Sequence, residues 1–107
     1  MNQARFFNRL EELYAICVGI SRRKNADYAG DADPFKNFRL IELLTNGRIT
    51  VEEGILVRIS DKIQRVANLL EPGKDAQVVD ESLLDTLSDA ANYLMILRVY
   101  LEEKASK

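Results

Sequence analysis

The chain has 107 residues, which is enough for one domain with a buried core and too few for two. Hydrophobic residues make up 47% and charged residues 30%, which excludes a disordered or fibrous chain. Fifteen basic and seventeen acidic side chains give a net charge of −2, so no basic field is present to attract duplex nucleic acid.

The side-chain inventory excludes several kinds of chemistry. The sequence has no histidine, and Cys17 is its single cysteine. An internal disulfide, a multi-cysteine zinc site and catalysis that needs imidazole are therefore excluded. Within the first 24 positions, Arg5, Arg9, Glu11 and Glu12 stand among the apolar residues, unlike a signal peptide or a membrane span. We expect a cytoplasmic protein, in a bacterium or a phage-infected cell, with no membrane partner.

The first predicted helix covers residues 3 to 24, where apolar side chains recur at helical spacing. Residues 25 to 34 concentrate Gly, Pro, Asp and Asn, which predicts a loop of the kind that often holds ligands. Pro34 suits the first turn of a short helix over about residues 35 to 44. The apolar stripe of the first helix consists of Phe6, Leu10, Leu13, Cys17 and Ile20.

The third predicted helix has clear start and stop signals. Asn46 and Gly47 can end the short helix before it. Thr50 followed by Glu53 has the capping-box pattern, which places the start of the third helix there. The helix continues to about Leu70, before the next proline and glycine.

Asp80 can cap a fourth helix over about residues 81 to 103. The second half of this helix is hydrophobic almost all round, which predicts packing against several helices or a second subunit. Residues 77 to 79 can form at most a short extended piece. The sequence thus predicts a single all-α domain over residues 1–107, a compact unit of three long helices and one short helix, which we expect to form an oligomeric bundle.

Polar residues form a stripe on each of the last two predicted helices. On the third helix the stripe is typical of a solvated face with local ion pairs. On the fourth helix the acidic line continues into apolar positions, so we expect that line to be partly covered. The third-helix stripe is Arg58, Asp61, Arg65 and Asn68, and the fourth-helix line is Glu81, Asp85, Asp89 and Asn92.

Carboxylates spaced four residues apart repel one another, so the acidic line needs cations beside it. Either the basic residues Arg58, Lys62 and Arg65 supply them, as in a salt-bridge network without a ligand, or a hard divalent ion does. Magnesium is the natural ion, because it binds carboxylates together with phosphate oxygens. Its candidate ligands are Glu81, Asp85 and Asp89.

Side chains around the 25–34 loop suit a nucleotide. Basic residues there can bind phosphates, although scattered basic residues beside a loop are more often only solvated. Aromatic residues there can stack on a base, although the two phenylalanines are about as often core residues. The residues concerned are Lys24, Lys36, Arg39, Tyr28, Phe35 and Phe38.

Three sequence blocks, in this order, resemble the small phage and prophage family called nucleotide modification associated domain, type one. They are DYAGDADPFKNF (27–38), EEGILVRISDKIQRVANLL (52–70) and DESLLDTLSDAANYLMIL (80–97). The resemblance covers about Lys24 to Leu101 and implies an association with nucleotide metabolism rather than a particular reaction. The positions that carry the motif are Tyr28, Asp33, Phe35, Asn37, Asp61, Lys62, Arg65, Asn68, Asp80, Glu81, Asp85, Asp89 and Asn92.

The chain is more loosely similar to the all-α nucleoside triphosphate pyrophosphohydrolases of the MazG and dimeric dUTPase type. Those enzymes bind magnesium between acidic helices and usually act as dimers or tetramers. Their signature pairs ExxE on one helix with ExxD on the next, whereas here Glu52 and Glu53 are adjacent and the later acids are four apart. This departure weakens the case for hydrolysis more than the case for nucleotide binding.

The sequence is consistent with three functions. One is a magnesium-dependent nucleotide pyrophosphohydrolase, in which the metal activates water and basic residues neutralise the phosphates. Another is a non-catalytic sponge that sequesters a cyclic or signalling nucleotide of host defence, and the third is an oligomeric interaction module without a ligand. The catalytic candidates are Asp61, Glu81 and Asp85. The expected nucleotide-binding residues are Lys24, Tyr28, Asn37, Lys62, Arg65, Asn68 and Asn92.

Overall fold

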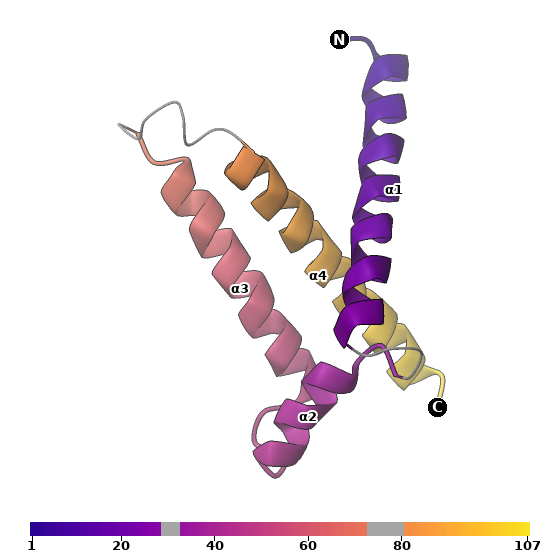
Figure 1. Cartoon of the computed structure of the whole chain (residues 1–107), viewed down its shortest axis with the longest axis vertical. Coiled ribbons are helices and arrows are strands. Elements are labelled where there is room, and N and C mark those ends of the chain that lie inside the picture. The colour runs from indigo at the N-terminus through magenta and orange to yellow at the C-terminus, as the bar shows by residue number, and fades with distance from the viewer. Residues whose placement is uncertain (29–32, 73–80) are drawn as a thin grey trace.

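The computed structural model describes residues 1–28, 33–72 and 81–107, and for residues 26–28 and 81–82 it describes the backbone alone. These ranges contain four helices and no strand (Figure 1). The helices are α1 (Gln3–Tyr28), α2 (Lys36–Leu44), α3 (Val51–Leu69) and α4 (Glu81–Ala105). The predicted all-α fold, with three long helices and one short helix, is therefore confirmed. Within the described part of the chain, no helix is long and apolar enough to cross a membrane.

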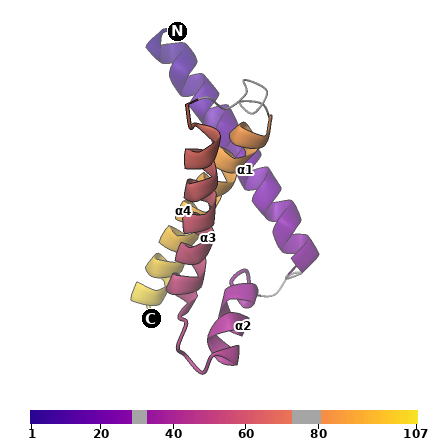
Figure 2. The same ribbon diagram turned by 90° about the vertical axis from the view of Figure 1, so that its left-hand side faces the viewer.

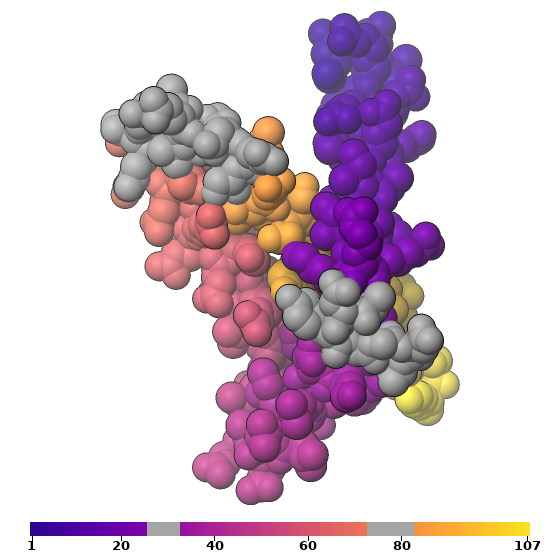
Figure 3. Space-filling model, in the orientation of Figure 1, coloured from indigo at the N-terminus to yellow at the C-terminus, as the bar shows by residue number. Residues whose placement is uncertain are grey.

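α3 and α4 lie side by side and run in opposite directions (Figures 1 and 2). α2 packs against α3 at the end where α3 begins. α1 crosses α4 near its own C-terminal end, and its N-terminal half projects away from the other helices (Figure 3). The fold is thus a helical pair closed at one end by α2 and crossed by α1.

The core lies where α2, the start of α3 and the C-terminal half of α4 meet. It consists of Phe35, Val51, Ile55, Ile59 and Tyr100, of which Val51 and Ile55 are fully buried. The rings of Phe35 and Tyr100 meet edge to face, with centroids 5.2 Å apart and planes at 73°. These apolar side chains fix the position of α2 against the α3–α4 pair.

Two local signals position α3 as the sequence predicts. The backbone N–H of Glu53 donates to Thr50 Oγ1 at 3.1 Å, and the backbone N–H of Thr50 donates to Glu53 Oε1 at 3.1 Å, which completes the capping box. Asn46 and Gly47 adopt φ values of 52° and 79°, the left-handed conformation that ends helices. The predicted boundaries of α2 and α3 on this side are therefore confirmed.

The predicted loop over residues 25–34 is wrong in its first part. α1 continues to Tyr28, because no proline interrupts its backbone hydrogen bonds and no glycine follows Gly19 before that point. At the other end of the loop, Pro34 lies in a turn, and α2 begins at Lys36 rather than at Phe35. The predicted cap at Asp80 and the extended piece at 77–79 lie outside the described residues.

Asp33 stabilises the turn that leads into α2. Its Oδ1 accepts a hydrogen bond from the backbone N–H of Phe35 at 3.0 Å, and its carboxylate forms an ion pair with Arg39. Burial alone raises the pKa of Asp33, but the Phe35 N–H and the Arg39 guanidinium outweigh it and lower the pKa below its usual value. The Arg39 guanidinium also lies 5.8 Å and 5.7 Å from the ring centroids of Phe35 and Tyr100. Asp33 and Arg39 therefore connect α2 to the core.

A second ion pair joins the end of α4 to the start of α3. Lys104 Nζ lies 2.6 Å from Glu52 Oε2. The hydrogen bond from Lys104, together with the backbone N–H of Glu52 itself, lowers the pKa of the Glu52 carboxyl. Both ion pairs lie at the core end of the molecule, away from the part of α1 that projects.

Candidate functional site

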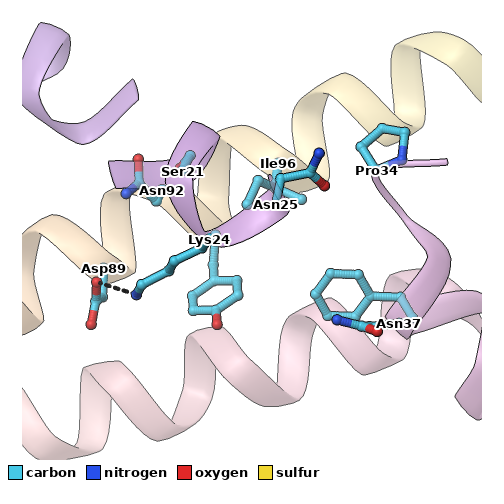
Figure 4. Close-up of a pocket in the computed structure, with 10 residues that line it drawn as sticks. Ser21, Lys24, Asn25, Pro34, Asn37, Asp89, Asn92 and Ile96 are labelled. Atoms are coloured by element: carbon cyan, nitrogen blue, oxygen red, sulfur yellow. Dashed lines mark ion pairs between the residues drawn. The ribbon is translucent and has the colours of Figure 1, made fainter. Parts of the chain in front are cut away.

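A cavity of about 140 Å³ lies where the C-terminal part of α1 meets the middle of α4 and the start of α2 (Figure 4). Its polar lining comes from all three helices: Ser21, Lys24, Asn25, Asn37, Asp89 and Asn92. Its apolar lining is Pro34, Phe38, Tyr93 and Ile96. The cavity therefore combines hydrogen-bonding groups with two aromatic rings.

Helical spacing explains why these side chains converge. On α1 the lining residues follow one another at intervals of three and one, and on α4 at intervals of three, one and three. Residues three and four apart share one face of a helix, so each helix presents a single face to the cavity. α2 adds Asn37 and Phe38 from its first turn, which Asp33 and Arg39 hold in place.

Asp89 is the electrostatic centre of the site. Its Oδ1 lies 3.5 Å from Lys24 Nζ on α1, and its Oδ2 lies 3.4 Å from Lys62 Nζ on α3. The side chains of Asp89 and Lys62 are only 25% and 28% exposed, so water screens this pair less than a surface pair. Lys62, one of the basic residues expected to supply positive charge to the acidic line, thus meets Asp89, and Lys24 joins it from α1. Figure 4 shows Lys24 reaching from α1 toward this carboxylate.

Two neighbouring hollows extend the cavity. One of about 360 Å³ shares Ser21 and Asn92 with it and adds the apolar side chains of Val18, Met95 and Val99. The other, also about 360 Å³, adds Arg58 on the far side of a wall formed by Asn37, Phe38 and Tyr93. Ligand pockets usually measure about 300–1,000 Å³, so the cavity alone is small and needs these extensions to hold a whole nucleotide.

Several predicted site residues do come together. Lys24, Asn37, Asp89 and Asn92 line the cavity, and Lys62 contacts it through Asp89. The other predicted residues with described side chains do not line it and are exposed. These are Asp61, Arg65, Asn68 and Asp85. Tyr28 and Glu81 are also predicted site residues, but the structure describes only their backbone.

The structure shows how the predicted metal ligands lie relative to one another where their side chains are described. Among the side chains that the structure describes, no group of three or more acids or cysteines could hold a metal ion together. Asp85 is exposed, and Asp89 is already paired with two lysines. Because the Glu81 side chain is outside the description, the magnesium site stays a prediction.

Arg39 and Phe35, which the sequence offered both as nucleotide contacts and as ordinary surface or core residues, have structural roles. Arg39 pairs with Asp33, and Phe35 is a core residue with 4% of its surface exposed. Phe38, three residues later, lines the cavity. The sequence alone could not separate the two phenylalanines, because their burial depends on how α2 lies against α4.

Sequence reasoning missed Ser21, Asn25, Tyr93 and Ile96. The loop that the sequence predicts includes Asn25, and only the continuation of α1 to Tyr28 places this residue on the same helical face as Ser21. Tyr93 follows Asn92 directly, and the face they share was detectable from the acidic line, which continues into Ile96.

Comparison with known proteins gives no match: no family model, no curated protein and no solved structure matches this chain. The two family resemblances therefore stay sequence-based expectations.

Proposed function

We propose that this chain binds a nucleotide in the cavity between α1, α2 and α4, and that it holds this ligand without cleaving it. The observation that carries the proposal is the convergence of three amide side chains beside two aromatic rings. The amides are those of Asn25, Asn37 and Asn92, and the rings are those of Phe38 and Tyr93.

Amides and aromatic rings are the groups that proteins use to bind bases. An asparagine side chain offers both donors and an acceptor, so it can match the polar edge of a nucleobase. Unpaired bases are commonly stacked on aromatic side chains while their edges form hydrogen bonds. Phe38 and Tyr93 supply the rings, and the apolar side chains of the adjoining hollow suit the flat faces of a base or sugar.

The phosphates would lie beside the lysines. Lys24 and Lys62 approach Asp89 from opposite helices, and the Lys24 side chain is more than half exposed. An exposed ammonium can turn from a carboxylate to a phosphate at little cost, because its flexible stem allows several positions. Arg58, in the third hollow, offers a further cation on the other side of Tyr93.

The arrangement of carboxylates favours holding the ligand over hydrolysing it. Asp61 and Asp85 are exposed and do not line the cavity, and Asp89 is engaged by two ammonium groups. Magnesium-dependent hydrolysis is the second candidate, favoured by one observation: Asp89 opens onto the cavity and Asp85 lies one turn earlier on α4. Phosphate oxygens could complete such a site, since magnesium often binds one or two carboxylates together with phosphates.

A binding panel tests the proposal. Calorimetry with nucleoside mono-, di- and triphosphates and cyclic nucleotides should find at least one ligand with micromolar affinity, about −8 kcal/mol. The ligand recovered after denaturing the protein should be chemically intact, with or without magnesium. Absence of binding to every member would contradict the proposal, and magnesium-dependent release of pyrophosphate would favour the second candidate.

Asp89→Asn separates the two candidates with a single atom change. If Asp89 only neutralises Lys24 and Lys62, its removal leaves both ammonium groups for the phosphates, and affinity should rise up to about tenfold. If Asp89 binds magnesium, the variant should lose magnesium-dependent affinity. Glu11→Gln is the matched control, because Glu11 is an exposed acid on α1 that neither lines the cavity nor belongs to the candidate metal ligands.

A further inference from the structure

The chain exposes more surface than a compact monomer of its mass. Its accessible surface is 8212 Å² for 12.2 kDa. A folded monomer of this mass is expected to expose about 6,100 Å², so the excess is about 2,100 Å². In obligate homodimers each partner buries roughly 1,000–2,500 Å². The excess therefore matches the area that one partner of a stable dimer needs to cover.

Part of the excess is an apolar stripe on α4. We call it the α4 stripe; it consists of Leu84, Leu87, Ala91, Leu94, Arg98 and Leu101. Its residues alternate at intervals of three and four, the spacing at which two helices pack along a common seam. The four leucines are 46–61% exposed, although Leu83, Ala90 and Tyr100 on the same helix are buried. One face of α4 is thus covered and the α4 stripe is open.

The second open apolar surface lies on α1. Its stripe is covered at Cys17, which is 6% exposed and has its Sγ 4.0 Å from the Ser88 carbonyl oxygen. Toward the N-terminus the same stripe becomes exposed, 37% at Leu13 and 47% at Phe6, as α1 projects past α4 (Figures 1 and 3). Helices in water draw most of their stability from packing, so this half of α1 needs a partner surface.

We infer that a second copy of this chain covers the α4 stripe and the projecting half of α1, forming a two-fold symmetric dimer. A two-fold interface uses the same patch on both copies, so one copy can supply cover for both open surfaces of the other. Because the net charge is only −2, two copies of the chain repel each other little when they associate. Arg98, the one charged residue in the α4 stripe, is paired with Glu102 at 2.9 Å, and a lone polar position in such a seam specifies the register.

Light scattering after size-exclusion chromatography tests this inference independently of any ligand. The native protein should have twice the chain mass of 12.2 kDa. Leu94→Glu, which places a charge in the α4 stripe, should reduce the mass to that of one chain with helical circular dichroism retained. Leu44→Glu is the matched control: Leu44 is an exposed leucine on α2, outside both surfaces, and its variant should stay dimeric.

Should Leu94→Glu unfold, the native protein still decides the question. A dimer's melting temperature rises with protein concentration, because association stabilises the folded state by mass action. A native mass of 12.2 kDa with a melting temperature that does not depend on concentration would overturn the inference. An equal mass for the folded Leu94→Glu and Leu44→Glu variants would overturn the assignment of the interface to the α4 stripe.

Discussion

α4 meets its neighbours through apolar side chains at one point and through polar ones at another. In its C-terminal half, Tyr100 packs with Phe35, Val51 and Ile55 in a core closed to water. Near its middle, the same helix has, beside apolar contacts, a group of polar ones with α1 and α3: the carboxylate of Asp89, amides and two lysines. Polar groups at a helix crossing stabilise a fold less than apolar ones of the same size. The core end thus contributes most to stability, and we propose that the polar residues at the crossing serve a ligand.

The largest expected effect is at the core end. Ile55→Ala removes a fully buried side chain and leaves a cavity, so the free energy of unfolding should fall by about 2–5 kcal/mol. Urea denaturation followed by circular dichroism measures this. Leu56→Ala, at the neighbouring exposed position, should change the free energy by no more than about 0.5 kcal/mol. Equal losses for the two variants would show that the core is misplaced.

A smaller effect is expected at the start of α3. Thr50→Ala removes the side-chain acceptor for the Glu53 N–H and breaks the capping box, which should cost about 1 kcal/mol. The same denaturation measurement applies, and Thr50→Ser, which keeps the hydroxyl, should restore most of the loss. If serine and alanine destabilise equally, the hydroxyl has no capping role.

The smallest expected effect is on how folding stability changes at acidic pH. The pKa values of Asp33 and Glu52 are lower in the folded chain than the unfolded values of about 3.9 and 4.3. The stability they contribute is therefore complete above about pH 5 and is lost as the pH falls through their folded pKa values, below about pH 4. Asp33→Asn should reduce the fall in folding stability at acidic pH only slightly, because the carboxylate is more than a third exposed. Identical denaturation curves against pH for the native and variant proteins would contradict a role for Asp33.

Much of the fold could be predicted because its signals are local. Apolar spacing and the Thr50 capping box place the helices, and Asn46 with Gly47 ends α2. The site was predicted only in part: Asp89 and Asn92 follow from one helical face, whereas the meeting of Lys24 with Asp89 depends on how α1 crosses α4. That crossing is set by tertiary packing between distant segments, which no local pattern encodes.

If the polar residues at the crossing of α1 and α4 serve a ligand, replacing one of them should weaken ligand binding without lowering the stability of the fold. Asn92 is half-buried at the crossing, and leucine has the same branched shape and number of heavy atoms but no hydrogen-bonding group. If the amide serves a ligand, Asn92→Leu should leave stability unchanged or raise it, whereas a structural role for the amide would make the same variant less stable.

Nucleotide binding at the crossing of α1 and α4 is tested by comparing the affinity of Asn92→Leu with that of Asn68→Leu, both measured by calorimetry with the tightest ligand of the panel. Asn68 is an exposed asparagine on α3 that does not line the cavity. We expect at least about a tenfold weaker affinity for Asn92→Leu, equivalent to about 1.4 kcal/mol, and native affinity for Asn68→Leu. Native affinity in the folded Asn92→Leu variant would place the nucleotide elsewhere and contradict the account.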